Sequence, residues 1–245
     1  MKIFQDIGQY FLLMGRVMSK PDDLSVFRES VWKEIILIGY YSIVIVVIIS
    51  AFIGAVITLQ TAYNMTNPIY PDYIIGLGTR DSVILEFSST IVGLVLAGKV
   101  GSSIASHIGT MQVTQQIDAL ETMGVNSANY LILPKIVAAV ISFPFLGILS
   151  MITGIAGGWI AGTMSGEVPA AQYVYGLQYM FIPYYMVYSL IKICVFGIII
   201  SSVASYYGYY TRGGALEVGK ASTTAVVNSS LIILIFNLLL TALLL

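Results

Sequence analysis

Long apolar stretches dominate the hydrophobic pattern of this chain. No charge lies between Glu34 and Asp72, and residues 35–59 form an apolar stretch that is about 37 Å long as a helix. That length crosses a hydrocarbon core of about 30 Å. Further apolar stretches predict four more membrane helices at residues 83–106, 136–164, 183–207 and 221–245. The pattern therefore predicts an all-α integral membrane protein with five spans.

Two of the predicted spans carry charged residues. The second contains Glu86 and Lys99, and the fourth contains Lys192, about 13 Å from the start of its helix. At that depth an ammonium costs a few kcal/mol unless it is paired or extends to the membrane surface. Glu86 is a candidate counter-ion, and the pair could contact a phospholipid head group. We favour extension of Lys192 to the membrane surface, and the alternative is that Glu86 and Lys192 form a pair that lines a possible lipid path.

Composition supports the membrane assignment and excludes other classes. The chain is 58% hydrophobic and 9% charged, whereas soluble domains carry about a quarter charged residues. A net charge of -1 argues against nucleic acid as a partner, because a phosphate-binding surface needs a basic excess. The single cysteine, Cys194, excludes an intramolecular disulfide framework.

The basic residues are unevenly distributed between the two sides of the predicted membrane. Only Arg80 falls on the side opposite the N-terminus, and Lys192 is assigned to the membrane. The positive-inside rule then predicts a cytoplasmic N-terminus and, after five spans, a C-terminus on the far side. The nine basic residues on the N-terminal side are Lys2, Arg16, Lys20, Arg28, Lys33, Lys99, Lys135, Arg212 and Lys220.

Residues 1–34 precede the first span and have an amphipathic pattern. Apolar residues recur every three or four positions, which predicts helices that lie on the membrane surface. The pair Asp22 and Asp23 is expected to cap the second of these helices. We therefore expect an interfacial arm at 1–34 and a five-span membrane domain at 35–245. The predicted lipid-facing residues are Ile3, Ile7, Phe11, Met14 and Met18, then Leu24, Phe27, Val31 and Trp32.

The segment GTMQVTQQIDALETMGVN, residues 109–126, predicts a short amphipathic helix at about 111–124. Ile117, Leu120 and Met123 have helical spacing, and Gly124 can adopt the left-handed conformation that ends a helix. One interpretation is a surface helix that lies among lipid head groups. The other is a docking helix that transmits the movement of a partner to the spans.

Small residues recur at intervals of four along the third span. They form a flat stripe on which another helix can pack closely. The partner helix could belong to the same protomer or to a second copy, and we favour the same protomer. The stripe consists of Ser150, Gly154, Gly158 and Gly162.

Two features suggest chemistry but do not support it. The stretch RGGALEVGKAS, residues 212–222, is close to a phosphate-binding loop, but Ala221 stands where the magnesium-binding Ser or Thr is needed. His107 is the only histidine, and the chain offers no second histidine or paired cysteines for a metal site. We expect a structural or head-group contact for His107. No catalytic, cofactor-binding or metal-binding residue is predicted.

Two blocks of the sequence resemble a known family. They are AGKVGSSIASHIGTMQVTQQIDALETMGVN, followed by YLILPKIVA, and SYYGYYTRGGALEVGKASTTAVVNSSLIILIFNLLLT. Both are similar to the MlaE/YrbE family, the permease subunits of ABC transporters that work with Mce-type lipid-binding proteins. The resemblance implies a homodimer in the bacterial inner membrane, with cytoplasmic ABC ATPases and a periplasmic Mce-domain protein as partners. It implies transport of phospholipid or another large lipid, with ATP-Mg bound in the ATPase and no cofactor in this chain.

The same resemblance implies where the ATPase docks, although some positions depart from the family pattern. His107, Gln112, Gln115 and Asn237 stand where other residues are common in the family. With neutral Gln112 and Gln115, ionic contacts to an ATPase are expected to be weaker. The docking residues implied are Gln116, Asp118, Leu120, Glu121 and Met123.

Two other functions are weighed against this one. A self-sufficient channel or secondary transporter would need no ATPase, but the spans lack a ladder of ionisable residues and an obvious repeat of broken helices. An intramembrane enzyme is disfavoured because the catalytic residue sets are missing. The sequence therefore favours a permease that depends on a separate ATPase.

Overall fold

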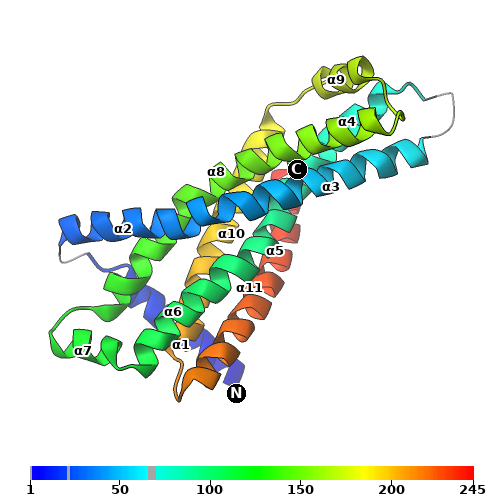
Figure 1. Cartoon of the computed structure of the whole chain (residues 1–245). Coiled ribbons are helices and arrows are strands. Elements are labelled where there is room, and N and C mark those ends of the chain that lie inside the picture. Colours follow the sequence, from blue (N-terminus) through cyan, green and yellow to red (C-terminus); the bar gives the residue numbers. More distant parts are fainter. Residues whose placement is uncertain (1, 21–22, 66–69) are drawn as a thin grey trace. The chain divides into compact units, whose positions relative to one another are not determined.

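The computed structural model describes residues 2–20, 23–65 and 70–245, with side chains described from residue 6 onward (Figure 1). Within these ranges every regular element is helical. Five helical stretches are long and apolar enough to cross a membrane, which confirms the predicted all-α class and the number of spans. They are Leu24–Asn64, Tyr73–Val113, Ser127–Met164, Tyr184–Tyr209 and Ala215–Leu244.

The first two stretches are assembled from several elements. In the first, a 3-10 turn, η1 (Tyr40–Ser42), joins α2 (Leu24–Ile38) to α3 (Ile43–Asn64). The second contains two π-helical segments, which the hydrophobic pattern does not predict. Its elements are α4 (Tyr73–Ser82), η2 (Val83–Ile91), α5 (Val92–Leu96), η3 (Ala97–Gly101) and α6 (Ser102–Val113).

The remaining spans are single helices, and short helices lie between them. The chain divides into two compact units, of which unit 1 comprises residues 1–41, 96–143 and 194–239. Unit 2 comprises residues 42–95, 144–193 and 240–245. The remaining elements are α1 (Lys2–Val17), α7 (Gln116–Thr122), α8 (Ser127–Met164), α9 (Ala170–Gln178), α10 (Tyr184–Tyr209) and α11 (Ala215–Leu244).

In unit 1, α1 is amphipathic in the predicted manner. Leu13 and Val17 are fully buried, whereas Ile7, Phe11 and Met18 of the predicted stripe are exposed. Because an exposed apolar face suits a lipid environment, this pattern agrees with an interfacial helix. The side chains of Lys2 and Ile3 lie outside the described residues, as does Asp22.

The second helix of the arm differs from the prediction in two ways. Asp23 caps α2 as expected, since its Oδ1 accepts a hydrogen bond of 2.7 Å from the backbone N–H of Ser25. However, Val31 is buried and does not face lipid. The helix also continues past residue 34 and ends at Gly39, where an added Cβ would lie 2.9 Å from Ser142 Oγ of α8. Close packing against α8 therefore accounts for the buried face of α2.

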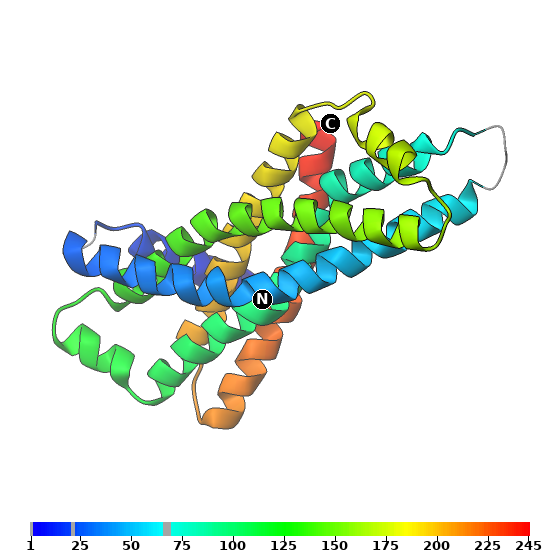
Figure 2. The ribbon, with the colours of Figure 1, turned by 45° about the horizontal axis from the view of Figure 1, so that its top comes forward.

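In unit 2, the stripe of small residues packs against α3 of the same chain. Figure 2 shows the second half of α8 running beside α3. The hydroxyls of Ser50 and Ser150 are hydrogen-bonded at 2.8 Å, and a Cβ added to Gly54 would lie 1.8 Å from the carbonyl oxygen of Gly154. A Cβ on Gly158 would lie 2.4 Å from Thr58 Oγ1. The predicted packing within the protomer is therefore confirmed.

A second close contact in unit 2 joins α4 to α9. A Cβ added to Gly176 would lie 2.0 Å from the carbonyl oxygen of Tyr73. Arg80 is buried and donates hydrogen bonds of 2.9 and 2.8 Å to the carbonyl oxygens of Leu177 and Tyr179. These carbonyls lie at the C-terminal end of α9, where a cation also complements the helix dipole. Arg80, the exception to the charge bias, therefore has a structural role.

The α3–α8 contact predicts that Gly54→Ala destabilises the protein. The new methyl group would overlap the Gly154 carbonyl, so the two helices must separate, at a cost of about 1–3 kcal/mol. Thermal unfolding of the purified protein in detergent measures the effect. The control is Gly219→Ala in α11, where no atom lies within 4 Å of the added Cβ. Equal melting temperatures for the two variants would contradict the packing argument.

Candidate functional site

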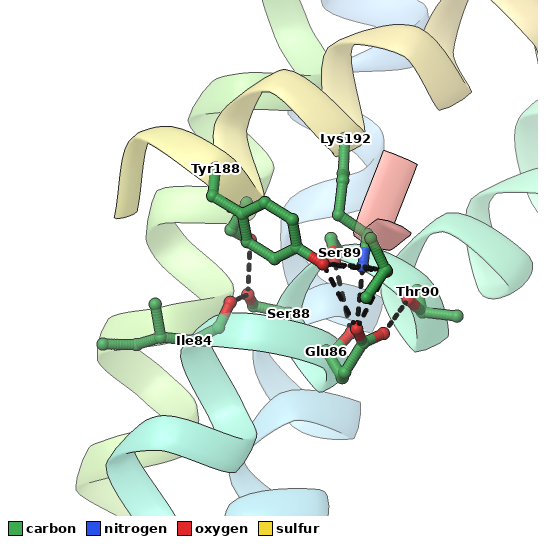
Figure 3. A network of polar contacts seen from close by, with 9 residues as sticks. Ile84, Glu86, Ser88, Ser89, Thr90, Tyr188 and Lys192 are labelled. Atoms are coloured by element: carbon green, nitrogen blue, oxygen red, sulfur yellow. Dashed lines mark hydrogen bonds and ion pairs between the residues drawn. The ribbon is translucent and has the colours of Figure 1, made fainter. Parts of the chain in front are cut away.

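A buried ammonium is the centre of the polar network in unit 2 (Figure 3). The Lys192 side chain of α10 is 0% exposed, and its Nζ lies 3.0 Å from Glu86 Oε1. It also donates to the hydroxyls of Tyr188, at 3.0 Å, and Thr241, at 3.3 Å. An ammonium has three N–H donors. All three therefore have acceptors without contact to solvent.

The carboxylate of this network is held from several sides. Glu86 Oε1 also accepts from Tyr188 and Thr241 at 3.4 Å, and Oε2 accepts from Thr90 at 3.0 Å. The Lys192 Nζ lies 4.8 Å from the centroid of the Tyr188 ring, within cation–π range. The pair is thus embedded in hydroxyl groups that stabilise both charges.

The backbone around Glu86 is unusual. Glu86 lies in η2, and π-helical turns inside α-helices are frequent at functional sites. In η2 the Ser88 hydroxyl is hydrogen-bonded at 3.1 Å to the Ser189 hydroxyl of α10, and either group can be the donor (Figure 3). This contact fixes η2 against the helix that carries Lys192.

The candidate counter-ion is confirmed, whereas the favoured prediction that Lys192 extends to the membrane surface is wrong. A lysine that extends to the membrane surface would be exposed, whereas this one is fully buried among hydroxyls. Tyr188 and Thr241 also belong to the network, and neither was predicted from the sequence. Tyr188 could have been found, because it precedes Lys192 by four residues and so shares its helix face. Thr241 comes from a distant helix and gave no local signal.

The two charges of the pair differ in accessibility. Glu86 retains 41% side-chain exposure, whereas Lys192 has none. A cationic group from outside can therefore reach the carboxylate first, and an anionic group reaches the ammonium only if Glu86 moves. The arrangement can exchange an internal ion pair for contacts to external charged groups.

The predicted docking helix in unit 1 is shorter than expected. Residues 111–113 belong to α6, and α7 begins at Gln116 because Gln115 has a left-handed backbone (φ 61°) that interrupts the helix. Gly124 ends α7 with a positive φ of 80°, as predicted. The helix therefore covers 116–122 rather than 111–124.

The predicted docking residues on and beside α7 differ in how far they are exposed. Ile117 is buried and anchors the helix, and Leu120 is half-buried. Gln116 and Asp118 are exposed, and Met123, just after the helix, is 77% exposed. These three residues provide a surface with one negative charge and one flexible apolar side chain.

Glu121 is directed toward its own chain instead. Its Oε1 accepts hydrogen bonds from Arg16 at 2.7 Å, Ser127 at 2.9 Å and Tyr209 at 3.0 Å. These partners come from α1, α8 and α10. Glu121 therefore ties α7 to three other helices of unit 1, a role that the resemblance did not indicate.

The hydrogen bond from Arg16 lowers the pKa of Glu121 and raises that of Arg16. Because the folded-state pKa of Glu121 lies below its ordinary value, the stabilisation is fully present above that ordinary value, about 4.3. It is lost only as the pH falls through the lowered pKa. The contact therefore persists at neutral pH.

The stretch that resembles a phosphate loop has another structure. From Ala215 onward it is the first part of α11, and it follows a helix rather than a strand. Lys220 forms an ion pair of 2.7 Å with Glu217, one turn earlier in the helix. Within the described ranges, no cluster of His, Cys, Asp or Glu side chains is arranged to hold a metal ion.

Comparisons with known proteins identify the family. The family described as "Permease MlaE" matches residues 31–243. A "Probable ABC transporter permease protein" of Rickettsia bellii is 36% identical over 242 residues, covering 99% of this chain and 93% of that protein. The "Intermembrane phospholipid transport system permease protein MlaE" of Haemophilus influenzae is 30% identical, covering 98% and 92%. "Protein TRIGALACTOSYLDIACYLGLYCEROL 1, chloroplastic" of Arabidopsis thaliana is 31% identical, covering 89% and 62%.

The matched region includes the first four predicted spans, all but the last two residues of the fifth, the α7 segment and both members of the Glu86–Lys192 pair. Its helical architecture and its five candidate spans agree with a membrane permease. The chain therefore belongs to the MlaE family of ABC transporter permeases.

Proposed function

We propose that this chain is the non-catalytic membrane subunit of an ABC transporter that moves phospholipid or another large lipid. The transfer would run between the inner membrane and a periplasmic Mce-type protein, powered by a separate ATPase that binds ATP-Mg. Membership of the permease family carries the proposal, and the name of the Haemophilus influenzae relative supports phospholipid as the substrate.

The Glu86–Lys192 pair supplies a contact for the lipid head group in this proposal. The half-exposed carboxylate attracts the ammonium of a zwitterionic head group, and its displacement opens Lys192 to the phosphate. Lysine is a common phosphate ligand. The hydroxyls of Tyr188 and Thr241 keep the ammonium solvated while it changes partners. Exchange of one set of polar contacts for another lowers the cost of moving a charged group through the membrane.

The helix α7 is the proposed docking element for the ATPase. Its exposed residues Gln116, Asp118 and Met123 offer contacts to a partner, while Glu121 fixes the helix to unit 1. A docking helix must be rigidly attached if it is to transmit force. The hydrogen bonds of Glu121 therefore support a lever role for α7.

The proposed assembly contains two copies of this chain in the bacterial inner membrane. The basic residues favour an N-terminus in the cytoplasm, on the same side as the ATPase. Arg80 does not weaken this orientation, because its charge is buried against α9. The C-terminus would then face the periplasm.

We expect Lys192→Met to reduce ATP-driven lipid transport by about tenfold or more, since a lost charge-assisted hydrogen bond costs about 1.5–3 kcal/mol. Insertion into the membrane should be unchanged, because methionine suits an apolar helix. Transfer of labelled phospholipid in vesicles with the partner ATPase measures the effect.

A double variant separates transport from stability. Glu86→Gln alone leaves the buried ammonium without its carboxylate and should lower the free energy of unfolding by about 2 kcal/mol or more. In Glu86→Gln/Lys192→Met both charges are absent, so stability should recover while transport stays low. Normal transport by the double variant would refute a role for these charges in the lipid path.

For ATPase docking, we expect Asp118→Lys to weaken co-purification of the ATPase at an unchanged melting temperature, because the side chain is exposed. Glu121→Ala should lower the melting temperature as well, since it removes the acceptor for three hydrogen bonds. Glu29→Lys on α2 is the matched control for charge reversal at an exposed acid. Retention of the ATPase by both α7 variants at wild-type levels would rule out α7 as the docking element.

A further inference from the structure

A hollow in unit 1 combines positive charge with apolar walls. It has a volume of about 200 Å³ and lies between α2, the η3–α6 segment and α8. Its polar side chains are Glu34, Lys99, Ser103, His107 and Lys135, and its apolar side chains are Leu37, Ile38, Val100 and Ile104. It shares no residue with the Glu86–Lys192 network.

The charges in this hollow do not cancel. Lys135 and Glu34 form an ion pair in which both side chains are largely buried, so these two charges neutralise each other. Lys99 donates a hydrogen bond to the backbone carbonyl of Tyr41 and forms no ion pair with any carboxylate among the described residues. The hollow therefore has a net charge of about +1 when His107 is neutral.

The position of Lys99 favours an anionic ligand. A half-buried ammonium with only a neutral carbonyl as its partner gains most from a mobile anion. His107 is exposed on the same segment, two turns further on, and its ring can donate a hydrogen bond to an oxygen of that anion. The π-helical segment η3 carries Lys99 into the hollow, which a regular helix would orient differently.

The walls favour a ligand that is attached to a lipid. Leu37 lines the hollow and is 56% exposed, so the apolar wall continues onto the outer face of α2. Trp32, elsewhere on α2, is also exposed and suits a membrane interface. A volume about seven times the ~30 Å³ of one water molecule accommodates a head group but not a whole lipid. Basic pockets between membrane helices typically bind lipid head groups.

We propose that this hollow binds the phosphate of a membrane phospholipid head group, with Lys99 as counter-ion and His107 as hydrogen-bond donor. The site is distinct in its residues from the proposed transport path. It would hold a lipid against the interfacial arm and gives a role to the only histidine of the chain.

Native mass spectrometry of the purified full-length chain in neutral detergent measures its affinity for phosphatidylglycerol and so tests the proposal. Lys99→Gln should lower the affinity about tenfold, because a charge-assisted contact is lost. Lys99→Arg should retain the affinity. Lys33→Gln is the matched control, since Lys33 is an exposed lysine of α2 that pairs with Glu29 and does not line the hollow.

A second variant keeps the test independent of the charge change. Ser103 is exposed at the hollow, so Ser103→Phe should fill the space, preserve folding and also lower the affinity. Repeating the series in a Lys192→Met background removes any lipid held by the network in unit 2. Failure of the transport proposal would therefore leave this result unchanged.

Deacylated phosphatidylglycerol distinguishes the two sources of phosphate. If it binds much more weakly than the lipid, the ligand is a membrane lipid, as proposed. Equal binding that depends on Lys99 would retain the phosphate site but assign it to a soluble phosphodiester. An affinity for phosphatidylglycerol that is the same in Lys99→Gln, Ser103→Phe and wild type would overturn the proposal.

Discussion

A fully buried ammonium in an apolar helix must have its charge and its hydrogen bonds satisfied by the protein. Lys192 meets this constraint through Glu86, Tyr188 and Thr241, which come from η2, α10 and α11. Three helical elements must therefore meet at one point of unit 2. The close contacts along Gly54 and Gly154, where backbone approaches backbone, give α3 and α8 a packing that tolerates little change.

A similar principle operates in unit 1, but around a carboxylate. Glu121 accepts from Arg16, Ser127 and Tyr209, so α7 is attached to the interfacial helix α1 and to two long helices. These contacts persist at neutral pH because the hydrogen bond from Arg16 lowers the pKa of Glu121. Each unit thus contains one acid whose hydrogen bonds connect several helices. In unit 2 that acid is half-exposed beside a buried base, and in unit 1 it supports an exposed helix.

The parts that the sequence predicted are those encoded by local patterns. Apolar length gave the five spans, the four-residue repeat gave the α3–α8 contact, and Gly124 marked the end of α7. The parts that it missed depend on tertiary contacts or on backbone irregularity. No sequence pattern near Thr241 indicates its contact with Lys192. Val31 is buried because α2 packs against the rest of unit 1. The hydrophobic pattern does not distinguish the π-helical segments η2 and η3 from α-helix, yet these segments carry Glu86 and Lys99.

Coupling to a separate ATPase is the step that most directly distinguishes a permease of this family from a self-sufficient carrier. The decisive measurement is transfer of labelled phospholipid in liposomes that contain this chain, with and without the ABC ATPase and ATP. Transfer should require both the ATPase and ATP, and the ATPase should be stimulated by lipid only when this chain is present. Flux of lipid or ions through the chain alone would contradict the proposed function.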